Sequence, residues 1–221
     1  TARDRLSILA KLSVRTRLAF NLRPKGAVAL VRTFAEKEQN PSQIYRIHAV
    51  NSPNKLAIVS PKESITFGEL DRRIDSVAAG LREFGVRRGA SVLLMMKNRP
   101  EFTVAQIAIG RVGASAVSVP WRSTPAEVAY LASHSGAVLA IFDGEFTDVI
   151  RAAKKEAALS FGEVTTTGSV AGTISFESLL DKRAGRTEKD ESDNAAVIVY
   201  TSGTTGKPKG AVRKFSKAAI Y

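Results

Sequence analysis

The sequence predicts an α/β protein with a mostly parallel sheet flanked by helices, and three observations lead to this class. Short apolar runs alternate with longer amphipathic runs from Leu56 onward. The short runs are almost continuously apolar, as strands buried on both faces of a sheet are. The longer runs begin at capping residues and end near glycines, as helices do. Strands that are separated by helices pair in parallel, with the helices on both faces of the sheet.

The first predicted elements lie between residues 41 and 85. A helix is expected between Pro41 and Pro53, and the run LAIVS at residues 56–60 is expected to form a strand. Thr66 and Glu69 have the spacing of a capping box, in which a hydroxyl and a carboxylate each bind a free amide at the start of a helix. The helix that follows is expected to end at Gly85, and its apolar face is formed by Leu70, Ile74, Val77, Leu81 and Phe84.

The middle of the chain alternates strands and helices, and a last strand follows a less regular segment. Strands are predicted for SVLLMM at 91–96, ASAVSV at 114–119, AVLAIFD at 137–143 and AAVIVY at 195–200. One helix is expected to start around Asn98, Pro100 and Glu101 and to run to about Val112. A second is expected to be capped by Thr124, Pro125 and Glu127 and to end near Gly136. A third is expected to cover about 145–158. Residues 160–194 are less regular.

The composition excludes several classes of protein. The 221 residues include no Cys, so disulfides, thiolate metal sites and cysteine nucleophiles are excluded and a cytoplasmic location is expected. Two His are too few for a metal centre built from histidines. The apolar runs are shorter than the roughly 20 residues that cross a bilayer.

The net charge of +12 is concentrated near the start of the chain. Residues 1–46 hold ten Lys or Arg and three Asp or Glu, a net of +7. Residues 27–38 are expected to be helical, and apolar residues at helical spacing between Leu6 and Phe20 suggest an amphipathic surface helix. A solvated extension, peripheral contact with a membrane and nucleic-acid binding stay open, and the scattered charges and the lack of a nucleic-acid motif argue against the last.

A run of small polar residues directly follows the last predicted strand. The run supplies hydroxyl donors, positive charge and glycines whose backbone amides can approach an anion without an intervening Cβ. Ligands of parallel sheets bind beyond the carboxyl ends of the strands, where this run begins. We therefore predict a polyphosphate-binding loop formed by Thr201, Ser202, Gly203, Thr204, Thr205, Gly206, Lys207 and Lys209.

This loop differs from two other phosphate-binding motifs. The Walker loop has four residues between its glycines and Ser or Thr after its lysine. Here two residues separate Gly203 from Gly206, and Pro208 follows Lys207. The GxGxxG dinucleotide fingerprint is absent from the sequence. A flexible linker is the remaining alternative, but a linker does not require two lysines around a proline directly after a buried strand.

The segment YTSGTTGKPKG, residues 200–210, resembles the phosphate-loop signature of the AMP-forming adenylating enzymes. That family includes acyl- and aryl-CoA synthetases, luciferases and the adenylation domains of peptide synthetases. Segments beginning ITFGELDRR and GRVGASAVS resemble two further conserved blocks. The resemblance covers about Tyr45 to Lys214. It implies a basic, partly helical extension over 1–44 and an incomplete N-terminal, AMP-binding domain over 45–221.

The resemblance implies a two-step reaction that uses ATP, Mg²⁺ and coenzyme A. A small-molecule carboxylic acid, expected to be a fatty acid, attacks the α-phosphate of ATP, and the thiol of coenzyme A then takes the acyl group. The loop residues named above would hold the β- and γ-phosphates. The catalytic lysine of the family and its Mg²⁺-binding Thr–Glu pair would lie downstream, so no catalytic residue and no metal ligand is assigned within this chain.

Some features depart from the family pattern. This chain has Arg213, Lys214 and Phe215 where many family members have a His near the acyl site. The chain also stops at Tyr221, so the 221 residues alone are expected to form no acyl-adenylate. Two alternatives remain: an adenylating enzyme that loads a carrier protein, and a non-catalytic basic fragment that contacts the inner face of a membrane through residues 1–44. The sequence does not indicate an oligomeric state.

Three further side chains stand out because their types are rare in this chain. His48 lies in a predicted helix, and His134 lies near a helix end. We expect both to be structural. Trp121 follows a strand end, where it could line a ligand site, but packing is the favoured role.

Overall fold

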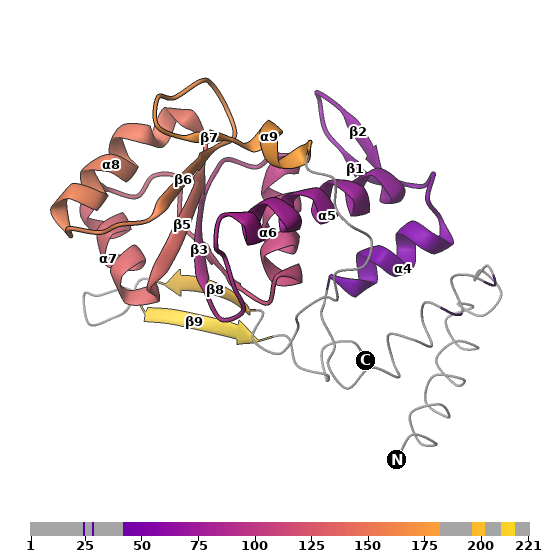
Figure 1. Cartoon of the computed structure of the whole chain (residues 1–221), viewed down its shortest axis with the longest axis horizontal. Coiled ribbons are helices and arrows are strands. Elements are labelled where there is room, and N and C mark those ends of the chain that lie inside the picture. The colour runs from indigo at the N-terminus through magenta and orange to yellow at the C-terminus, as the bar shows by residue number, and fades with distance from the viewer. Residues whose placement is uncertain (1–23, 25–27, 29–41, 182–195, 202–208, 215–221) are drawn as a thin grey trace, which may run out of the picture. The chain divides into compact units, whose positions relative to one another are not determined.

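The computed structural model describes residues 24, 28, 42–181, 196–201 and 209–214 (Figure 1). The chain divides into two compact units, Thr1–Gln39 with Gln43–Asp71, and Asn40–Ser42 with Arg72–Tyr221. The helices expected at 27–38 and between Leu6 and Phe20 lie outside the described residues, apart from the helical position Val28.

The first unit contains a helix and a small antiparallel sheet. Helix α4 covers Gln43–Asn51, within the limits that the two prolines predict. Strands β1 (Leu56–Val59) and β2 (Ser64–Thr66) pair with each other in antiparallel orientation. The predicted LAIVS strand therefore exists, but it belongs to this two-stranded sheet and not to the main one. Strand β2 was not predicted, because its three residues run directly into the start of the next helix.

Helix α5, Phe67–Glu83, starts at the predicted capping box. The Thr66 amide donates to Glu69 Oε2 at 2.9 Å, and the Glu69 amide donates to Thr66 Oγ1 at 3.3 Å. Phe84, predicted on the apolar face, is 40% exposed because the helix ends one residue before it. The other predicted residues of that face are at most 1% exposed: Leu70, Ile74, Val77 and Leu81.

The second unit is built on a seven-stranded sheet with the order β7-β6-β5-β3-β4-β8-β9. All neighbouring pairs are parallel except β8 and β9, which are antiparallel. The sheet is therefore mostly parallel, as predicted, and its middle strand β3 is buried along its whole length. The strands are β3 (Ser91–Met95), β4 (Ser115–Ser118), β5 (Ala137–Phe142), β6 (Gly162–Thr165), β7 (Ile174–Ser175), β8 (Ala196–Thr201) and β9 (Lys209–Lys214).

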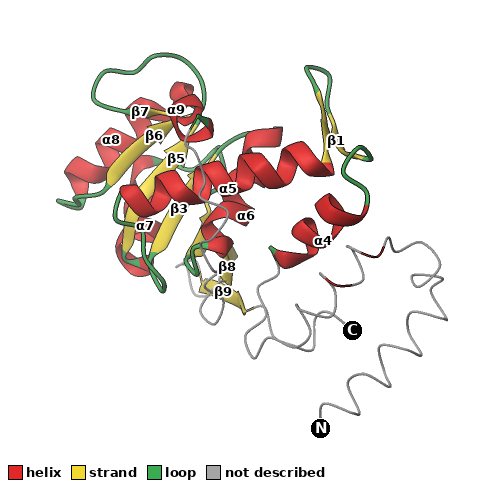
Figure 2. Ribbon diagram, turned by 45° about the vertical axis from the view of Figure 1, so that its right-hand side comes forward, coloured by secondary structure: helices red, strands yellow, loops and turns green. Residues whose placement is uncertain are grey.

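Helices cover both faces of this sheet (Figures 1 and 2). Helices α7 (Pro125–Ser135) and α8 (Thr147–Glu156) share a buried cluster with Leu93, Val117 and Phe142 of the strands. Helix α6 (Pro100–Arg111) packs against β3 and β4 on the opposite face. Successive residues of a strand point to opposite faces, so strands that are covered on both sides are apolar at nearly every position.

The structure corrects several predicted boundaries. Arg99 is the N-cap residue of α6, with no side-chain cap hydrogen bond, so Asn98 does not cap this helix. A 3₁₀ turn at Gly144–Phe146 precedes α8, which therefore starts later than predicted. The segment 160–194, predicted to be less regular, contains β6, β7 and α9 (Phe176–Leu180) among its described residues. Strand β9 was not predicted either, because its six residues follow the polar loop directly.

Candidate functional site

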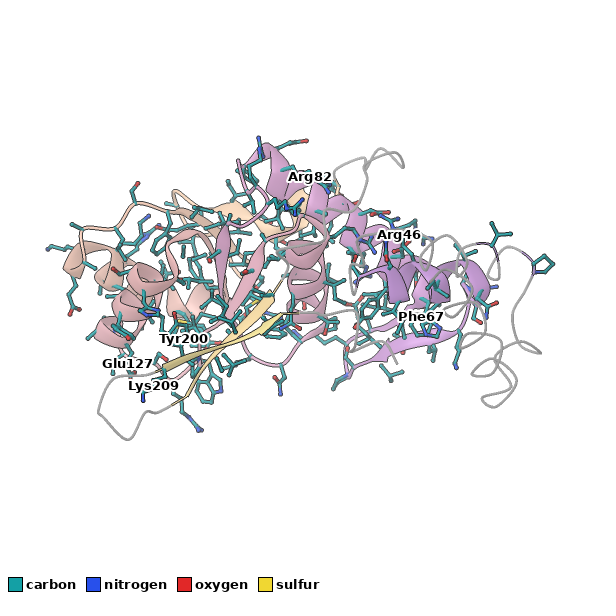
Figure 3. The ribbon with its side chains drawn as sticks, turned by 90° about the horizontal axis from the view of Figure 1, so that it is seen from below. Arg46, Phe67, Arg82, Glu127, Tyr200 and Lys209 are labelled. Atoms are coloured by element: carbon teal, nitrogen blue, oxygen red, sulfur yellow. The ribbon has the colours of Figure 1, made fainter. Side chains whose placement is uncertain are left out.

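An antiparallel strand pair closes the predicted phosphate-binding loop. Strand β8 ends at Thr201, strand β9 begins at Lys209, and these residues lie opposite each other in the ladder. Figure 3 shows Lys209 at the start of β9, and its side chain is exposed. The structure thus places Thr201 and Lys209, the first and last residues predicted to bind phosphate, on neighbouring strands. The others lie outside the described residues: Ser202, Gly203, Thr204, Thr205, Gly206 and Lys207.

The two ends of the loop lie at the carboxyl edge of the parallel sheet. Strand β8 pairs in parallel with β4, and Val199 lies opposite Ser118 near the end of both strands. The chain leaves β4 through Pro120 and Trp121 and enters α7. Residues after β4 therefore share an edge with Thr201, at the place where ligands of parallel sheets bind.

Tyr200, the residue before the loop, is held by side chains of α7. Its hydroxyl lies 2.8 Å from His134 Nδ1, a hydrogen bond whose donor depends on the His tautomer. The Tyr130 ring stacks on His134 with centroids 5.5 Å apart, and the Tyr200 ring meets both edge-on. Burial and the neighbouring Tyr130 raise the pKa of Tyr200 above its ordinary value, so the phenol stays protonated at neutral pH.

Gly210 makes room for the Tyr200 ring on the neighbouring strand. The two residues are paired in the β8–β9 ladder. A Cβ on Gly210 would lie 3.1 Å from an edge carbon of the Tyr200 ring, closer than carbon atoms normally approach. The partly buried Tyr200 thus contacts side chains of α7 and packs against β9. The sequence analysis gave His134 only a structural role, because nothing in the sequence indicates that residues 66 positions apart are in contact.

A buried carboxylate ties together the ends of β3, β5 and β6 at the same edge. Asp143 is 2% exposed, and its Oδ1 accepts a hydrogen bond from Arg99 Nη1 at 2.7 Å. Its Oδ2 accepts from the Lys97 amide at 2.9 Å, and the Thr166 hydroxyl donates to Oδ1. Both carboxylate oxygens therefore accept hydrogen bonds from groups inside the protein. These bonds connect the segments that follow β3, β5 and β6.

The hydrogen bonds decide the ionisation of Asp143. Burial alone would raise its pKa, but the Thr166 hydroxyl, the Lys97 amide and the charged Arg99 together lower it below the ordinary value. The pKa of Arg99 is raised above its ordinary value. Burial alone would lower it, but the hydrogen bond to Asp143 and the negative charges of Glu101 and Asp143 outweigh that effect. Asp143 is therefore a fixed negative charge at neutral pH.

Trp121 lies exposed at this edge with two cations near its ring. The favoured prediction was a packing role, but 42% of the residue is accessible. The Arg122 guanidinium carbon lies 4.2 Å from the ring centroid, and Lys97 Nζ lies 5.5 Å from it. Lys97 also pairs with Glu145 at 2.8 Å. This end of the sheet therefore combines positive charge with a partly exposed aromatic side chain.

The described residues include neither a grouped metal site nor a membrane span. Within them, no three His, Asp or Glu side chains cluster as ligands for a metal ion. None of the helices in the described ranges has the length and apolar character needed to cross a bilayer.

Comparison with known proteins gives one family. The model of the AMP-binding enzyme family matches residues 45–220. Naringenin synthase of Pestalotiopsis fici is 33% identical over 187 residues, which are 79% of this chain and 7% of that protein. 4-Coumarate–CoA ligase 5 of Oryza sativa subsp. japonica is 33% identical over 151 residues, which are 67% of this chain and 27% of that protein.

Solved structures are similar over the same region. The Mycobacterium tuberculosis fatty acyl CoA synthetase matches with a TM-score of 0.67 and 28% identity, over 79% of this chain and 34% of that one. An anthranilate CoA ligase in complex with anthranoyl-AMP matches in fold with a TM-score of 0.75 and 24% identity, over 81% of this chain and 35% of that one. The chain thus spans about a third or less of the length of these relatives.

Proposed function

The chain belongs to the AMP-binding enzyme family, and from this we propose that the protein containing it activates a carboxylic acid with MgATP and transfers the acyl group to coenzyme A. A carboxylate oxygen forms a bond to the α-phosphorus, and the bond from that phosphorus to the bridging oxygen of the β-phosphate breaks. Pyrophosphate leaves with the electron pair. The thiol sulfur then attacks the acyl carbon, AMP leaves, and the thiol proton passes to solvent or to a base.

The loop between β8 and β9 would stabilise the pyrophosphate as it leaves. Negative charge grows on the leaving oxygens in that step, and preorganised donors and cations stabilise such charge strongly in a site that excludes water. We assign this role to Thr201, Ser202, Thr204, Thr205, Lys207 and Lys209, with Gly203 and Gly206 permitting the backbone to bend around the phosphates.

One observation carries this proposal: the strand ladder closes at the pair Thr201 and Lys209, at the carboxyl edge of the parallel sheet. The ladder thus fixes the residue from which the chain leaves the sheet and the residue at which it returns. Lys209 starts a strand with its side chain exposed, which suits a cation that must reach a phosphate.

We further propose that the carboxylic acid substrate is a fatty acid. The basic residues at the start of the sequence and the similarity to a fatty acyl CoA synthetase support a fatty acid. An aromatic acid is the second candidate, because curated relatives include ligases of 4-coumarate and of hydroxybenzoates.

ATP–pyrophosphate exchange in the longer protein tests the activity and the acid together. We expect labelled pyrophosphate to enter ATP only when a suitable acid is present. The panel should pair fatty acids of several lengths with benzoate, 4-coumarate and succinylbenzoate. Exchange with fatty acids alone supports the first candidate, and exchange with the aromatic acids alone supports the second. A protein that catalyses no exchange with any acid contradicts the proposed activity.

The thiol acceptor is tested separately. With the acid that supports exchange, coenzyme A and a carrier protein bearing pantetheine are offered in turn, and thioester is measured. We expect the thioester of coenzyme A. Thioester on the carrier protein alone would support the alternative in which the enzyme loads a carrier.

A further inference from the structure

We propose that His134 is a positioning residue for the phosphate-binding loop, acting through the hydroxyl of Tyr200. This inference rests on the proposed function, because it assumes that the loop at 201–209 binds the triphosphate of MgATP. His134 lies in the last turn of α7, and Tyr200 is the residue before the loop. Their hydrogen bond of 2.8 Å connects a helix to the strand from which the loop starts.

The position of the Tyr200 ring is restricted on several sides. The rings of Tyr130 and His134 both meet it edge-on, at centroid distances of 6.4 and 5.7 Å. Gly210 faces it from β9, where even a methyl group would press against the ring. The hydrogen bond to His134 adds a directional polar contact to these ring contacts.

The strand ladder passes this restraint to the loop. Tyr200 pairs with Gly210, and the next pair is Thr201 with Lys209, the two residues that flank the loop. A displacement of Tyr200 would therefore move both ends of the loop. Stabilisation of developing charge depends on where the donors lie, and a misplacement of about 1 Å can cost about 100-fold in rate, so a smaller displacement should still slow the step that forms pyrophosphate.

The decisive experiment compares the two half-reactions in four variants of the longer protein. His134→Ala and Tyr200→Phe each remove one partner of the hydrogen bond, the double variant removes both, and His134→Asn keeps a hydrogen-bonding atom close to the position of Nδ1. The readouts are kcat/KM for ATP in adenylation and the rate of thioester formation from preformed acyl-adenylate.

A hydrogen bond between neutral groups has a net value that corresponds to about a 3- to 10-fold change in rate. We expect His134→Ala and Tyr200→Phe each to lower kcat/KM for ATP by about this factor. The double variant should be no slower than the worse single variant, because both remove the same interaction. His134→Asn should recover most of the loss, and thioester formation should stay at the wild-type rate in all four.

Matched controls come from the first unit of the chain. His48 stacks on Phe67 with ring centroids 4.8 Å apart, and Tyr45 is a partly buried tyrosine of α4. His48→Asn and Tyr45→Phe make the same chemical changes outside the loop, so they should leave kcat/KM for ATP unchanged.

The outcomes separate this inference from the proposed function. If the wild type catalyses exchange and the His134 and Tyr200 variants slow both half-reactions equally, or neither, the positioning role is wrong and the adenylating activity stands. If the wild type catalyses no exchange with any acid, the proposed function is wrong and the inference falls with it.

Discussion

Asp143 illustrates at the scale of a single residue how a charge inside the protein organises the edge of the sheet. Its carboxylate is almost completely buried and accepts hydrogen bonds from Arg99, Thr166 and the Lys97 amide. Removal of one partner of a buried ion pair is destabilising, and without Asp143 the largely buried Arg99 guanidinium would keep only its pair with Glu101 at 3.1 Å. The residues at the ends of β3, β5 and β6 therefore depend on this carboxylate.

Asp143→Asn is expected to lower the free energy of unfolding by about 3 kcal/mol at neutral pH. The matched control is Glu145→Gln, which breaks a pair with Lys97 whose side chains are about half exposed, and it should cost less than about 1 kcal/mol. The midpoint of urea unfolding measures both. Equal effects of the two variants would contradict the role given to Asp143.

The stabilisation by Asp143 should also depend on pH. Its pKa is lower in the folded protein than the value of about 3.9 in the unfolded chain. The contribution is therefore fully present above that value and is lost as the pH falls through the lower, folded pKa. The difference in stability between wild type and Asp143→Asn should shrink below about pH 4. A difference that grows on acidification would have the wrong sign.

Helix α7 is the element that links the fold to the candidate site. Its capping box is formed: the Thr124 amide donates to Glu127 Oε2 at 2.7 Å, and the Glu127 amide donates to Thr124 Oγ1 at 3.3 Å. Its C-cap is Gly136, with φ of 62°, a left-handed conformation that glycine adopts without strain. Between these ends the helix carries Tyr130 and His134.

Thr124→Ala is expected to destabilise the domain by about 1 kcal/mol, because the Glu127 amide loses its side-chain acceptor. Thr124→Ser keeps the hydroxyl and should cost much less. Thermal unfolding of the two variants measures the difference. Identical melting temperatures for the alanine and serine variants would argue that this cap contributes nothing to stability.

The sequence predicted the long elements well because their signals are local. Capping residues gave the starts of α5 and α7, and continuous apolar runs gave β3, β4, β5 and β8. The two residues of β7 and the five of α9 are too few to show a period. The pairing of β1 with β2, and of β8 with β9, depends on contacts that no local pattern encodes.

In the candidate site too, features formed by consecutive residues were predicted, and contacts between residues far apart in the sequence were not. The loop was predicted because its hydroxyls, glycines and lysines are consecutive in the sequence. The contact of Tyr200 with His134, and that of Asp143 with Arg99, join residues 66 and 44 positions apart. Such contacts follow from the order of strands in the sheet, which the sequence pattern alone does not determine.

At the scale of the whole molecule, the family match begins at residue 45. We propose that residues 1–44 form an extension outside the family domain and that residues 45–221 form part of its N-terminal domain. The curated relatives and solved structures described above are much longer than this chain. We therefore assign the proposed activity to a longer protein that contains this chain, and not to these 221 residues alone.

The most direct measurement compares the two half-reactions in Thr205→Ala and Lys209→Ala variants of that longer protein. If the loop binds the departing pyrophosphate, the rate of adenylation should fall by about 100- to 1,000-fold in each of the two variants, which is the loss typical of one preorganised donor. Thioester formation from preformed acyl-adenylate should stay near wild type, and Lys155→Ala, an exposed lysine of α8, should affect neither step. Equal losses in both half-reactions, or unimpaired adenylation, would contradict the account.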